Sequence, residues 1–327
     1  MLAPLTSGPG IVFTLHHVLP DPPELFAPNG LLCVSPDFLD RVIVAVRAAG
    51  YEFVTIDEAW SRVCDGRTER FCALTFDDGY RDFRDFAMPV LQRHDVPAAL
   101  FVTTGFADGT ADLWWEVLER SLAKLEHASI DLGSGPEALD LSTATAKSEA
   151  WRQMFPRLRA LPEPRMRGVI GGLAVAAGID SLALTRSECL DWDELAIVAA
   201  DPLVTIGVHT KNHYMLAKWP DDVVIEELTD SRAEIRQRLG VAADHLAYPV
   251  GTPIAAGLRE FEIAKELGFK AAWTTRPGHL FAEHSQHATA LPRVSLNGNF
   301  QEDRYIDLFL SGTPFAFWNR FRRVNSV

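Results

Sequence analysis

Cysteine is scarce in this 327-residue chain, and the cysteines present have no metal-binding spacing. The four cysteines are Cys33, Cys64, Cys72 and Cys189. No two of them form a CxxC pair, and three of the four lie in apolar or helix-like surroundings. This spacing indicates neither a zinc–cysteine site nor a disulfide framework, so we expect buried free thiols. Such cysteine usage is typical of a reducing compartment.

Basic residues are also fewer than acidic residues. The chain has 31 lysines and arginines against 44 aspartates and glutamates, which gives a formal net charge of −13. A nucleic-acid groove needs clustered positive charge to neutralise phosphates, so we expect no nucleic-acid partner. The acidic balance is compatible with a neutral sugar or an amino-sugar ligand.

Long apolar runs are missing as well. The stretch "VIGGLAVAAGI" at 169–179 is too short and too rich in glycine to span a bilayer. The first 20 residues lack both a basic region and a long apolar region, so no signal peptide is indicated. We therefore expect a cytoplasmic protein. The oligomeric state has no sequence signature.

What the chain does have is an alternation of short apolar strands and amphipathic helices, typical of an α/β enzyme. Near-continuous apolar strands separated by helices indicate a parallel sheet covered on both faces, and seven or eight of them favour a closed or nearly closed barrel. The predicted strands are 10–18, 51–55, 71–76, 98–104, 203–208, 245–249, 270–275 and 290–296. The first predicted helix has Ser35 as its N-cap, Pro36 in its first turn and Gly50 at its end.

The region from about 105 to 190 breaks this alternation. It contains no convincing strand, and its predicted helices are 112–128, 145–161 and 163–178. Because the alternation resumes afterwards, we interpret the region as a helical insertion on a barrel loop and the whole chain, 1–327, as a single domain. Trp114 and Trp115 either line a substrate cleft or pack the insertion onto the barrel, and packing is favoured.

The stretch "TFDDGY" places Asp77 and Asp78 directly after an apolar strand. Functional groups collect where strands of parallel sheets end. Two adjacent carboxylates repel each other and resist burial unless a positive or protic partner lies nearby. Alone, such a pair is more often a solvated turn or a helix cap.

A partner is available in "GVHTKNH", which follows another predicted strand. His209 and His213 are four residues apart, a spacing that places both imidazoles on one face if the chain turns helical there. With one carboxylate they form a two-histidine, one-carboxylate metal site with open positions. A phosphatase of the haloacid type also has aspartates after a strand, but separated by one residue, and it leaves the histidines unexplained.

Together, "TFDDG", "HTKNH" and "YPVG" resemble, in this order, the motifs of the polysaccharide deacetylases, the NodB-like carbohydrate esterases. The resemblance covers roughly 10–105 and 190–295. The opening "LHHVLP" is similar to a branch that carries a histidine on the first strand. The resemblance to this family implies a distorted (β/α)7 barrel that removes an N-acetyl group from a sugar or polysaccharide.

The resemblance also implies a role for each matching residue. Asp78, His209 and His213 would hold one divalent metal, most readily zinc, although cobalt, nickel, iron and manganese fit the same donors. Asp77 would act as general base on metal-bound water, and the Val250 amide would stabilise the tetrahedral oxyanion.

The general acid is a choice between adjacent histidines. His16 and His17 point to opposite faces of a strand, so only one can face the barrel mouth. We prefer His16, which matches the family's first-strand histidine. Tyr248 either shapes a turn or forms a platform for the sugar, and the sequence favours neither.

One position departs from the family pattern. Ala247 stands where many members have the arginine that pairs with the base aspartate. We predict that Arg293, in "LPRV", supplies that charge from across the barrel. A catalytically inactive glycan-binding barrel draws its only support from this departure, and a hydrolase of non-sugar amides is a further alternative.

The end of the chain, about 312–327, interleaves aromatic residues with arginines in "PFAFWNRFRRV". Such a tail more often packs on its own domain or on a partner subunit, and we favour that interpretation. Peripheral contact with an anionic membrane is the alternative.

Overall fold

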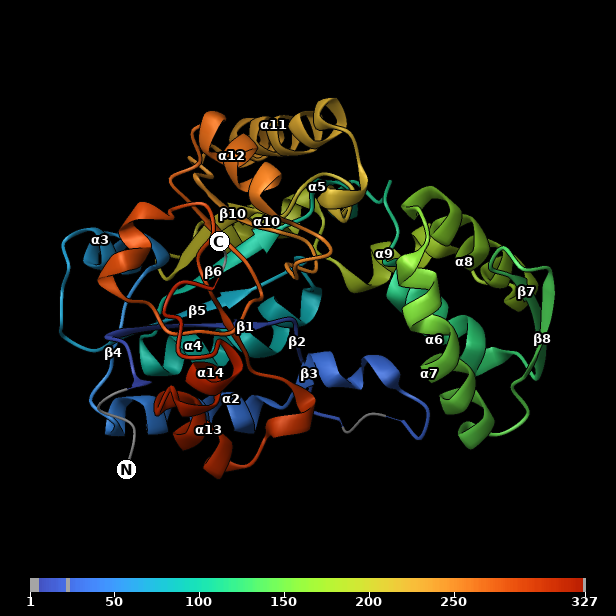
Figure 1. Ribbon diagram of the computed structural model, residues 1–327, viewed down its shortest axis with the longest axis horizontal. Coiled ribbons are helices and arrows are strands. Elements are labelled where there is room, and N and C mark those ends of the chain that lie inside the picture. The colour runs from blue at the N-terminus through green and yellow to red at the C-terminus, as the bar shows by residue number, and fades with distance from the viewer. Residues whose placement is uncertain (1–5, 22–23, 326–327) are drawn as a thin grey trace.

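A curled parallel sheet lies at the centre of the computed structural model, which describes residues 6–21 and 24–325 (Figure 1). Within these residues, the strands follow the order β11-β10-β9-β6-β5-β1-β12, and β4 pairs with the start of β5. The bounds are β1 Gly10–Leu15, β4 Glu52–Phe53, β5 Phe71–Phe76, β6 Ala98–Val102, β9 Val204–Val208, β10 His245–Ala247, β11 Ala271–Trp273 and β12 Val294–Ser295.

The two ends of this sheet are joined by one segment of chain. Leu291 forms a parallel bridge with Trp273 of β11, and Val294 of β12 pairs with Phe13 of β1. The segment that contains both residues therefore lies between the first and last strands. The expected distorted barrel of the α/β class is confirmed.

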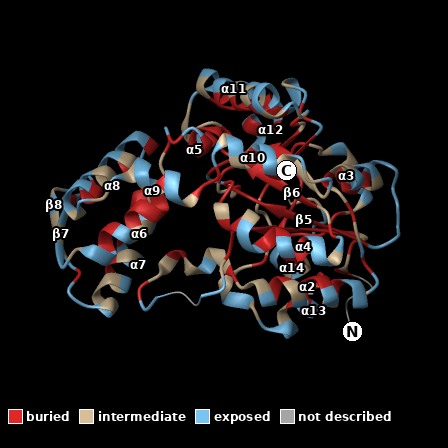
Figure 2. Ribbon diagram, turned by 180° about the vertical axis from the view of Figure 1, so that it is seen from behind, coloured by how far each residue is buried: buried red, intermediate tan, exposed pale blue. Residues whose placement is uncertain are grey.

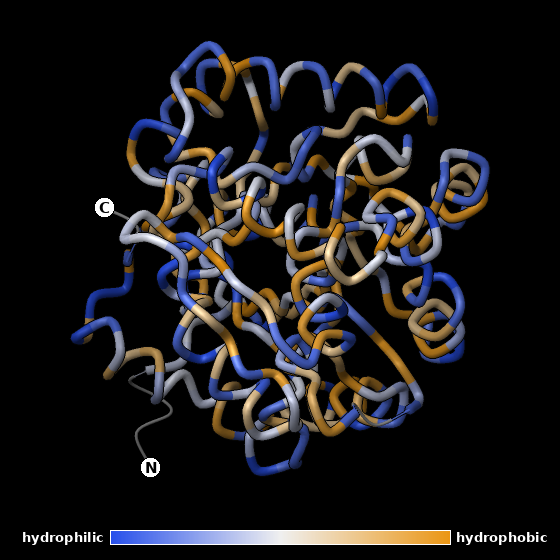
Figure 3. Tube along the Cα trace, turned by 90° about the vertical axis from the view of Figure 1, so that its right-hand side faces the viewer, coloured by the Kyte–Doolittle hydropathy of each residue, from blue (hydrophilic) through white to orange (hydrophobic). Residues whose placement is uncertain are grey.

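Helices cover the outside of the sheet, and every residue of β1, β5 and β6 is buried. Hydrophobic and hydrophilic positions alternate along these helices in the pattern of amphipathic elements (Figure 3). The bounds are α2 Pro36–Ala48, α3 Ile56–Cys64, η2 Phe83–Ala87, α4 Met88–His94, α5 Thr104–Ala107, α10 Trp192–Ala199, α11 Asp221–Leu239, α12 Leu258–Glu266, α13 Asp303–Leu310 and α14 Thr313–Trp318. Short elements on the loops are β2 His17–Val18, η1 Pro28–Leu32, β3 Cys33–Val34, η3 Leu216–Lys218, η4 Ala282–Gln286 and η5 Gly298–Phe300.

The first long helix begins and ends as its sequence predicts. The Ser35 hydroxyl accepts a hydrogen bond from the Phe38 amide, so Ser35 is the N-cap of α2, and Pro36 occupies the first turn. Gly50 has a φ of +80° just beyond the helix, a conformation that costs glycine little.

The expected insertion forms a lobe beside the barrel, on the right in Figure 1 and on the left in Figure 2. Its helices are α6 Trp114–Lys124, α7 Ala144–Ala160, α8 Glu163–Ala177 and α9 Ser181–Glu188. They share a hydrophobic cluster with Tyr80, Phe106 and Met215 from the barrel loops, and buried residues line the inner side of the lobe (Figure 2). The insertion is thus packed onto the barrel.

The expectation that this region has no strand is wrong. Strands β7 (His127–Asp131) and β8 (Pro136–Asp140) pair in an antiparallel hairpin. Gly133 and Gly135 adopt positive φ in its turn, and both amides donate to one carboxylate oxygen of Asp131. Both strands are largely exposed, so they lack the apolar run that identifies a buried strand.

All four cysteines are free thiols, as expected, but the expectation that they are buried holds only for Cys72 and Cys189. Cys72 and Cys189 are buried, and burial raises the pKa of both thiols well above the ordinary value. Cys33 is partly buried and Cys64 is exposed.

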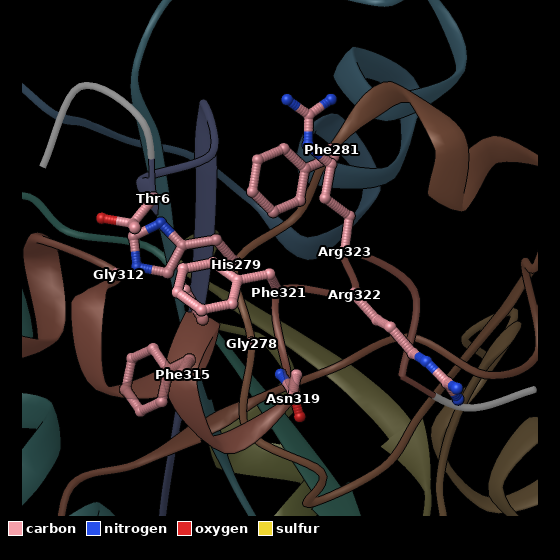
Figure 4. Close-up of a pocket in the computed structure, with 11 residues that line it drawn as sticks. Thr6, Gly278, His279, Phe281, Gly312, Phe315, Asn319, Phe321, Arg322 and Arg323 are labelled. Atoms are coloured by element: carbon pink, nitrogen blue, oxygen red, sulfur yellow. The ribbon is translucent and has the colours of Figure 1, made fainter. Parts of the chain in front are cut away.

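The C-terminal tail lies against the amino-terminal end of β1, as the close-up of this region shows (Figure 4). Phe315 is buried and its ring faces His279, which accepts a hydrogen bond from the Gly8 amide. The tail is therefore at the opposite end of the barrel from the strand carboxyl ends. Its last two residues, 326–327, are outside the described part.

Three aromatic side chains of the tail remain exposed even though Phe315 is buried. They are Phe317, Trp318 and Phe321. Arg323 pairs with Glu283 and stacks on Phe281, whereas Arg322 points away from these rings in Figure 4. The tail thus has a packed side and an exposed aromatic side.

Among the described residues, no individual helix has both the length and the apolar composition to cross a membrane. Helices α8 and α9 pass that test only when they are taken together, and they are bent by 93° relative to each other.

Candidate active site

The side chains that the sequence singles out gather at the carboxyl ends of four barrel strands. His16 follows β1, Asp77 and Asp78 follow β5, His209 follows β9, and Val250 lies after β10. Because these strands are parallel and adjacent or nearly adjacent in the sheet, their ends meet at one rim.

Asp78, His209 and His213 converge on one point. Asp78 Oδ1 lies 3.3 Å from His209 Nε2 and 3.3 Å from His213 Nε2. All three side chains are buried, and their candidate ligand atoms lie within 4.8 Å of one another. This is the two-histidine, one-carboxylate arrangement that the sequence predicts.

The hydrogen bonds around these residues fit a cation. The Nδ1 of His209 lies 2.7 Å from the Ala247 carbonyl oxygen, which can only accept, so Nδ1 carries a proton and Nε2 is the ring nitrogen that faces Asp78. Asp78 Oδ1 is buried and has no hydrogen-bond partner among the described residues. Buried lone pairs that face each other repel unless a positive charge lies between them, so this donor set fits a divalent metal.

The charge state of Asp78 agrees with this. Burial raises the pKa of the carboxyl group, but the two imidazoles outweigh burial, and the pKa lies well below the ordinary value. Asp78 is therefore an anion at neutral pH, as a ligand carboxylate must be.

The backbone of the site is held in unfavourable conformations. Asp78, Thr210, His213 and Val250 have φ values of 74°, 63°, 53° and 63°. The left-handed region costs a non-glycine residue on the order of 1–2 kcal/mol, and β-branched side chains are the least suited to it. Strain of this kind persists where the surroundings enforce it, and it concentrates at functional sites.

Asp77 points to a different partner. Arg293 binds it with two hydrogen bonds, Nη1 to Oδ1 and Nη2 to Oδ2, each 2.7 Å long. Arg293 is fully buried and also donates to the Thr75 hydroxyl and to the Thr274 carbonyl oxygen. Burial raises the pKa of Asp77, but the guanidinium of Arg293 together with the nearby histidines outweighs burial and lowers the pKa below the ordinary value. The structure thus brings Arg293 to Asp77, as the sequence analysis expects.

The two adjacent histidines have separate environments. His16 lines the same cleft as Asp77 and Asp78, and burial lowers its pKa. His17 is also buried, but its Nδ1 lies 2.6 Å from a carboxylate oxygen of Asp82. Burial lowers the pKa of His17, but the hydrogen bond and charge of Asp82, together with the charges of Glu116 and Asp78, outweigh burial and raise the pKa to about 9. His17 is therefore a charged structural residue, buried rather than facing outward.

Val250 and Tyr248 are near each other but differ in access. Val250 lines the cleft, and the hydrogen bonds among the described residues include none from its amide. Tyr248 is fully buried, donates to the Thr289 carbonyl oxygen and packs on Phe261. This placement favours Tyr248 as a residue that shapes the turn over Tyr248 as a sugar platform.

The comparison with protein families agrees with this geometry. A family model described as polysaccharide deacetylase matches residues 65–134 and 143–272, more than half of the chain. The chain belongs to the polysaccharide deacetylase family. Membership in this family implies a hydrolase that acts on acetylated carbohydrate, and it leaves the haloacid-phosphatase alternative without support.

Solved polysaccharide deacetylases share the fold at low sequence identity. The Streptococcus pyogenes deacetylase PplD, solved with acetate, is 19% identical with a TM-score of 0.56, and the match covers 90% of this chain and 93% of that one. IcaB from Ammonifex degensii is 16% identical with a TM-score of 0.55 and coverages of 93% and 97%. The BpsB deacetylase domain from Bordetella bronchiseptica is 17% identical with a TM-score of 0.51 and coverages of 88% and 95%. No curated protein matches the chain.

A cleft of about 300 Å³ opens above the candidate metal ligands, and its walls are mainly apolar. Trp114 and Trp115, on α6, line it while also being buried in the cluster that packs the insertion onto the barrel. Both sequence interpretations of these tryptophans therefore hold. Trp115 is close to the metal ligands, with its ring centroid 4.5 Å from that of His213.

Several residues of the cleft carry no signal in the sequence. They are Thr14, Asn29, Leu31, Leu32, Trp151, Phe155, Arg159, Thr252, Thr275 and Ser295. They come from the insertion, from η1 and from the ends of barrel strands, so only the folded chain assembles them. None has a motif through which the sequence alone could have identified it.

Helix α8 supports the loop that carries His213. Arg167 donates to the carbonyl oxygens of Asn212 and His213, and it pairs with Asp112 and Glu163. Glu163 is fully buried and accepts a hydrogen bond from the Met215 amide. The insertion therefore positions one of the candidate ligands.

Proposed function

We propose that this polysaccharide deacetylase is a metal-dependent hydrolase that removes the N-acetyl group from an N-acetylated sugar or polysaccharide. The observation that carries the proposal is the buried convergence of Asp78, His209 and His213 beside an arginine-paired second aspartate. Zinc is the metal we expect, and cobalt, nickel, iron and manganese suit the same donors.

Asp78, His209 and His213 would hold a divalent metal, which would act as a Lewis acid and would lower the pKa of a bound water towards ~7. Asp77, ionised and oriented by Arg293, accepts a proton from the attacking water. The Val250 amide donates a hydrogen bond to the oxyanion that develops on the acetamide oxygen.

His16 then supplies the proton that the leaving amine nitrogen requires when the C–N bond breaks. Burial lowers the pKa of this imidazole, which makes the protonated ring a strong acid. The products are acetate and a free amine on the sugar.

The bidentate pair between Arg293 and Asp77 weakens the alternative of an inactive glycan-binding barrel. That alternative depends on the arginine missing at Ala247, and Arg293 offers the same charge from β12's side of the barrel. The acetate-release assay described below distinguishes a non-sugar amide substrate from an N-acetylated sugar.

The first test is the metal content per chain after reconstitution and desalting. We expect one tightly held ion in the wild type, and its loss both in Asp78→Ala and in the His209→Ala/His213→Ala double variant. Equal metal content in the wild type and the variants would remove the proposal.

The second test is acetate release from N-acetylated glycans and from simple acetamides. Release from the glycans that Asp77→Asn abolishes would support the proposal. Release from acetamides alone would favour a non-sugar amide hydrolase.

A further inference from the structure

The cleft contains one guanidinium without a protein partner. Arg159, on α7, lines the cleft, and its Nε and Nη2 are both buried with no hydrogen-bond partner among the described residues. Its charge lies over the ring of Phe155, 5.7 Å from the centroid. Burial lowers the pKa of Arg159, and no described carboxylate offsets that effect.

Other arginines of the insertion do have carboxylate partners. Arg152 and Arg157, on the same helix, pair with Glu149 and Glu137. Two guanidinium nitrogens that are buried without an acceptor lose their hydration, and contact with an aromatic ring does not replace the lost hydrogen bonds, so the arrangement costs free energy. An anion brought by a ligand would supply the missing acceptor.

The carboxylates of the cleft are already engaged. Asp77 is bound by Arg293, and Asp78 faces the two histidines. Lys218 adds a second positive charge next to Arg159, because it lines an adjoining hollow with Arg159 and donates to the Arg159 carbonyl oxygen. Arg159 is the only lysine or arginine among the described residues that line the cleft, so it places a positive charge on this wall although the chain as a whole has a net charge of −13.

We infer that the cleft binds acylated sugars that carry an oxyanion group, a phosphate or a carboxylate, and that Arg159 binds this group. The inference rests on the proposed function for the kind of sugar, whereas the contact between Arg159 and an oxyanion does not depend on it. A planar guanidinium matches both oxyanions with two parallel hydrogen bonds. Trp114, Trp151 and Phe155 line the same cleft and present apolar surface to the sugar ring.

The experiment measures binding, by calorimetry, to the full-length, zinc-loaded protein at physiological salt. The probes are N-acetylglucosamine, which is neutral, N-acetylglucosamine 1-phosphate, and N-acetylmuramic acid, which carries a carboxylate. We expect at least one anionic sugar to bind about tenfold or more tightly than the neutral one, a ratio typical of a single charge-assisted contact. The phosphate and carboxylate arms show which oxyanion is preferred.

Three variants assign the contact. Arg159→Met keeps an apolar stem over Phe155 and is expected to lose the preference for anionic sugars. Arg152→Met, on the same helix with a largely exposed side chain, is the matched control and should keep it. Arg159→Lys should keep part of it, because the charge remains but the bidentate geometry is lost.

Equal affinity of the wild type for neutral and anionic sugars would overturn the inference. So would a preference that survives in Arg159→Met, because a metal-held anion would then explain it, and so would the absence of binding by all three sugars. Acetate release is not part of this readout. Failure of the proposed function would appear as absent turnover with the binding ratio intact.

Discussion

Two neighbouring aspartates at the rim of the barrel face different partners. Asp78 faces two imidazoles, whereas its neighbour Asp77 faces a guanidinium. Adjacent carboxylates can coexist in a buried site because each has its own positive or metal-binding environment. The two aspartates of "TFDDGY" are therefore suited to different tasks.

Replacing Arg293 by methionine tests the task of Asp77. Burial would then raise the pKa of Asp77 without the opposing guanidinium, so the carboxylate would be protonated up to a higher pH. We expect the acidic limb of the kcat/KM profile for acetate release to move to higher pH, and turnover to fall by about 10²-fold or more, the scale of a general base.

Arg41→Met, at an exposed site, is the control for this series. Arg293→Lys should restore part of the lost turnover. An unchanged pH–rate profile and turnover in Arg293→Met would remove Arg293 from the mechanism.

The raised pKa of His17 leads us to expect that the stability of the protein depends on pH. The pKa of this imidazole is about 9 in the folded protein against 6.5 ordinarily, so its contribution is fully present below about pH 6.5 and is lost as the pH rises through 9. This difference between the two pKa values corresponds to at most about 3 kcal/mol in the free energy of unfolding. Chemical denaturation between pH 6 and 10 should show this decline in the free energy of unfolding.

The decline should flatten in Asp82→Asn, which removes the carboxylate that His17 binds. His127→Gln, at an exposed position of β7, should leave the decline unchanged. The same slope in wild type and Asp82→Asn would contradict the assignment.

At the scale of elements, helix α8 of the insertion supports the barrel loop that carries the candidate ligand His213. Arg167 binds two carbonyl oxygens of that loop, including that of His213, whose φ is 53°. Such outer contacts orient a ligand and typically change metal affinity by 10–100-fold. The insertion therefore contributes to the site as well as to the wall of the cleft.

Arg167→Met tests this support. We expect the affinity for zinc, measured by competition with a chelator, to fall by about 10-fold or more, because the loop loses two hydrogen bonds. Arg165→Met, two residues earlier on the same helix and half-exposed, should keep the wild-type affinity. Equal affinities in the two variants would limit Arg167 to a purely structural role.

At the scale of the whole molecule, the tail and the cleft lie at opposite ends of the barrel. Phe315 secures the tail near Gly8 and His279, before the start of β1, whereas the cleft lies where the strands end. A membrane bound through the tail would not bring a membrane-linked glycan to the cleft.

We therefore expect Phe317→Ser/Trp318→Ser to co-sediment with anionic liposomes to the same extent as the wild type. Both side chains are largely exposed, so the double variant should keep its fold, which circular dichroism would verify. Lower recovery of the variant would instead assign the exposed side of the tail to a membrane surface.

Much of the fold could be predicted because its signals are local. The apolar runs of β1, β5 and β6 are buried throughout, and the Ser35 cap begins α2 where the sequence places it. The hairpin of β7 and β8 could not be predicted from the sequence. Both strands are largely exposed, and the helical pattern before them extends past Lys124.

The sequence by itself determined the alternation of strands and helices in the barrel, the family, and the side chains that meet where β5 and β9 end. These follow from residues adjacent in the chain, whose spacing is independent of distant contacts. Only the tertiary structure decided which histidine enters the cleft, that Arg293 reaches Asp77, and that Arg159 has no protein partner. Pairing and burial of charges depend on segments far apart in the chain, and only folding brings these together.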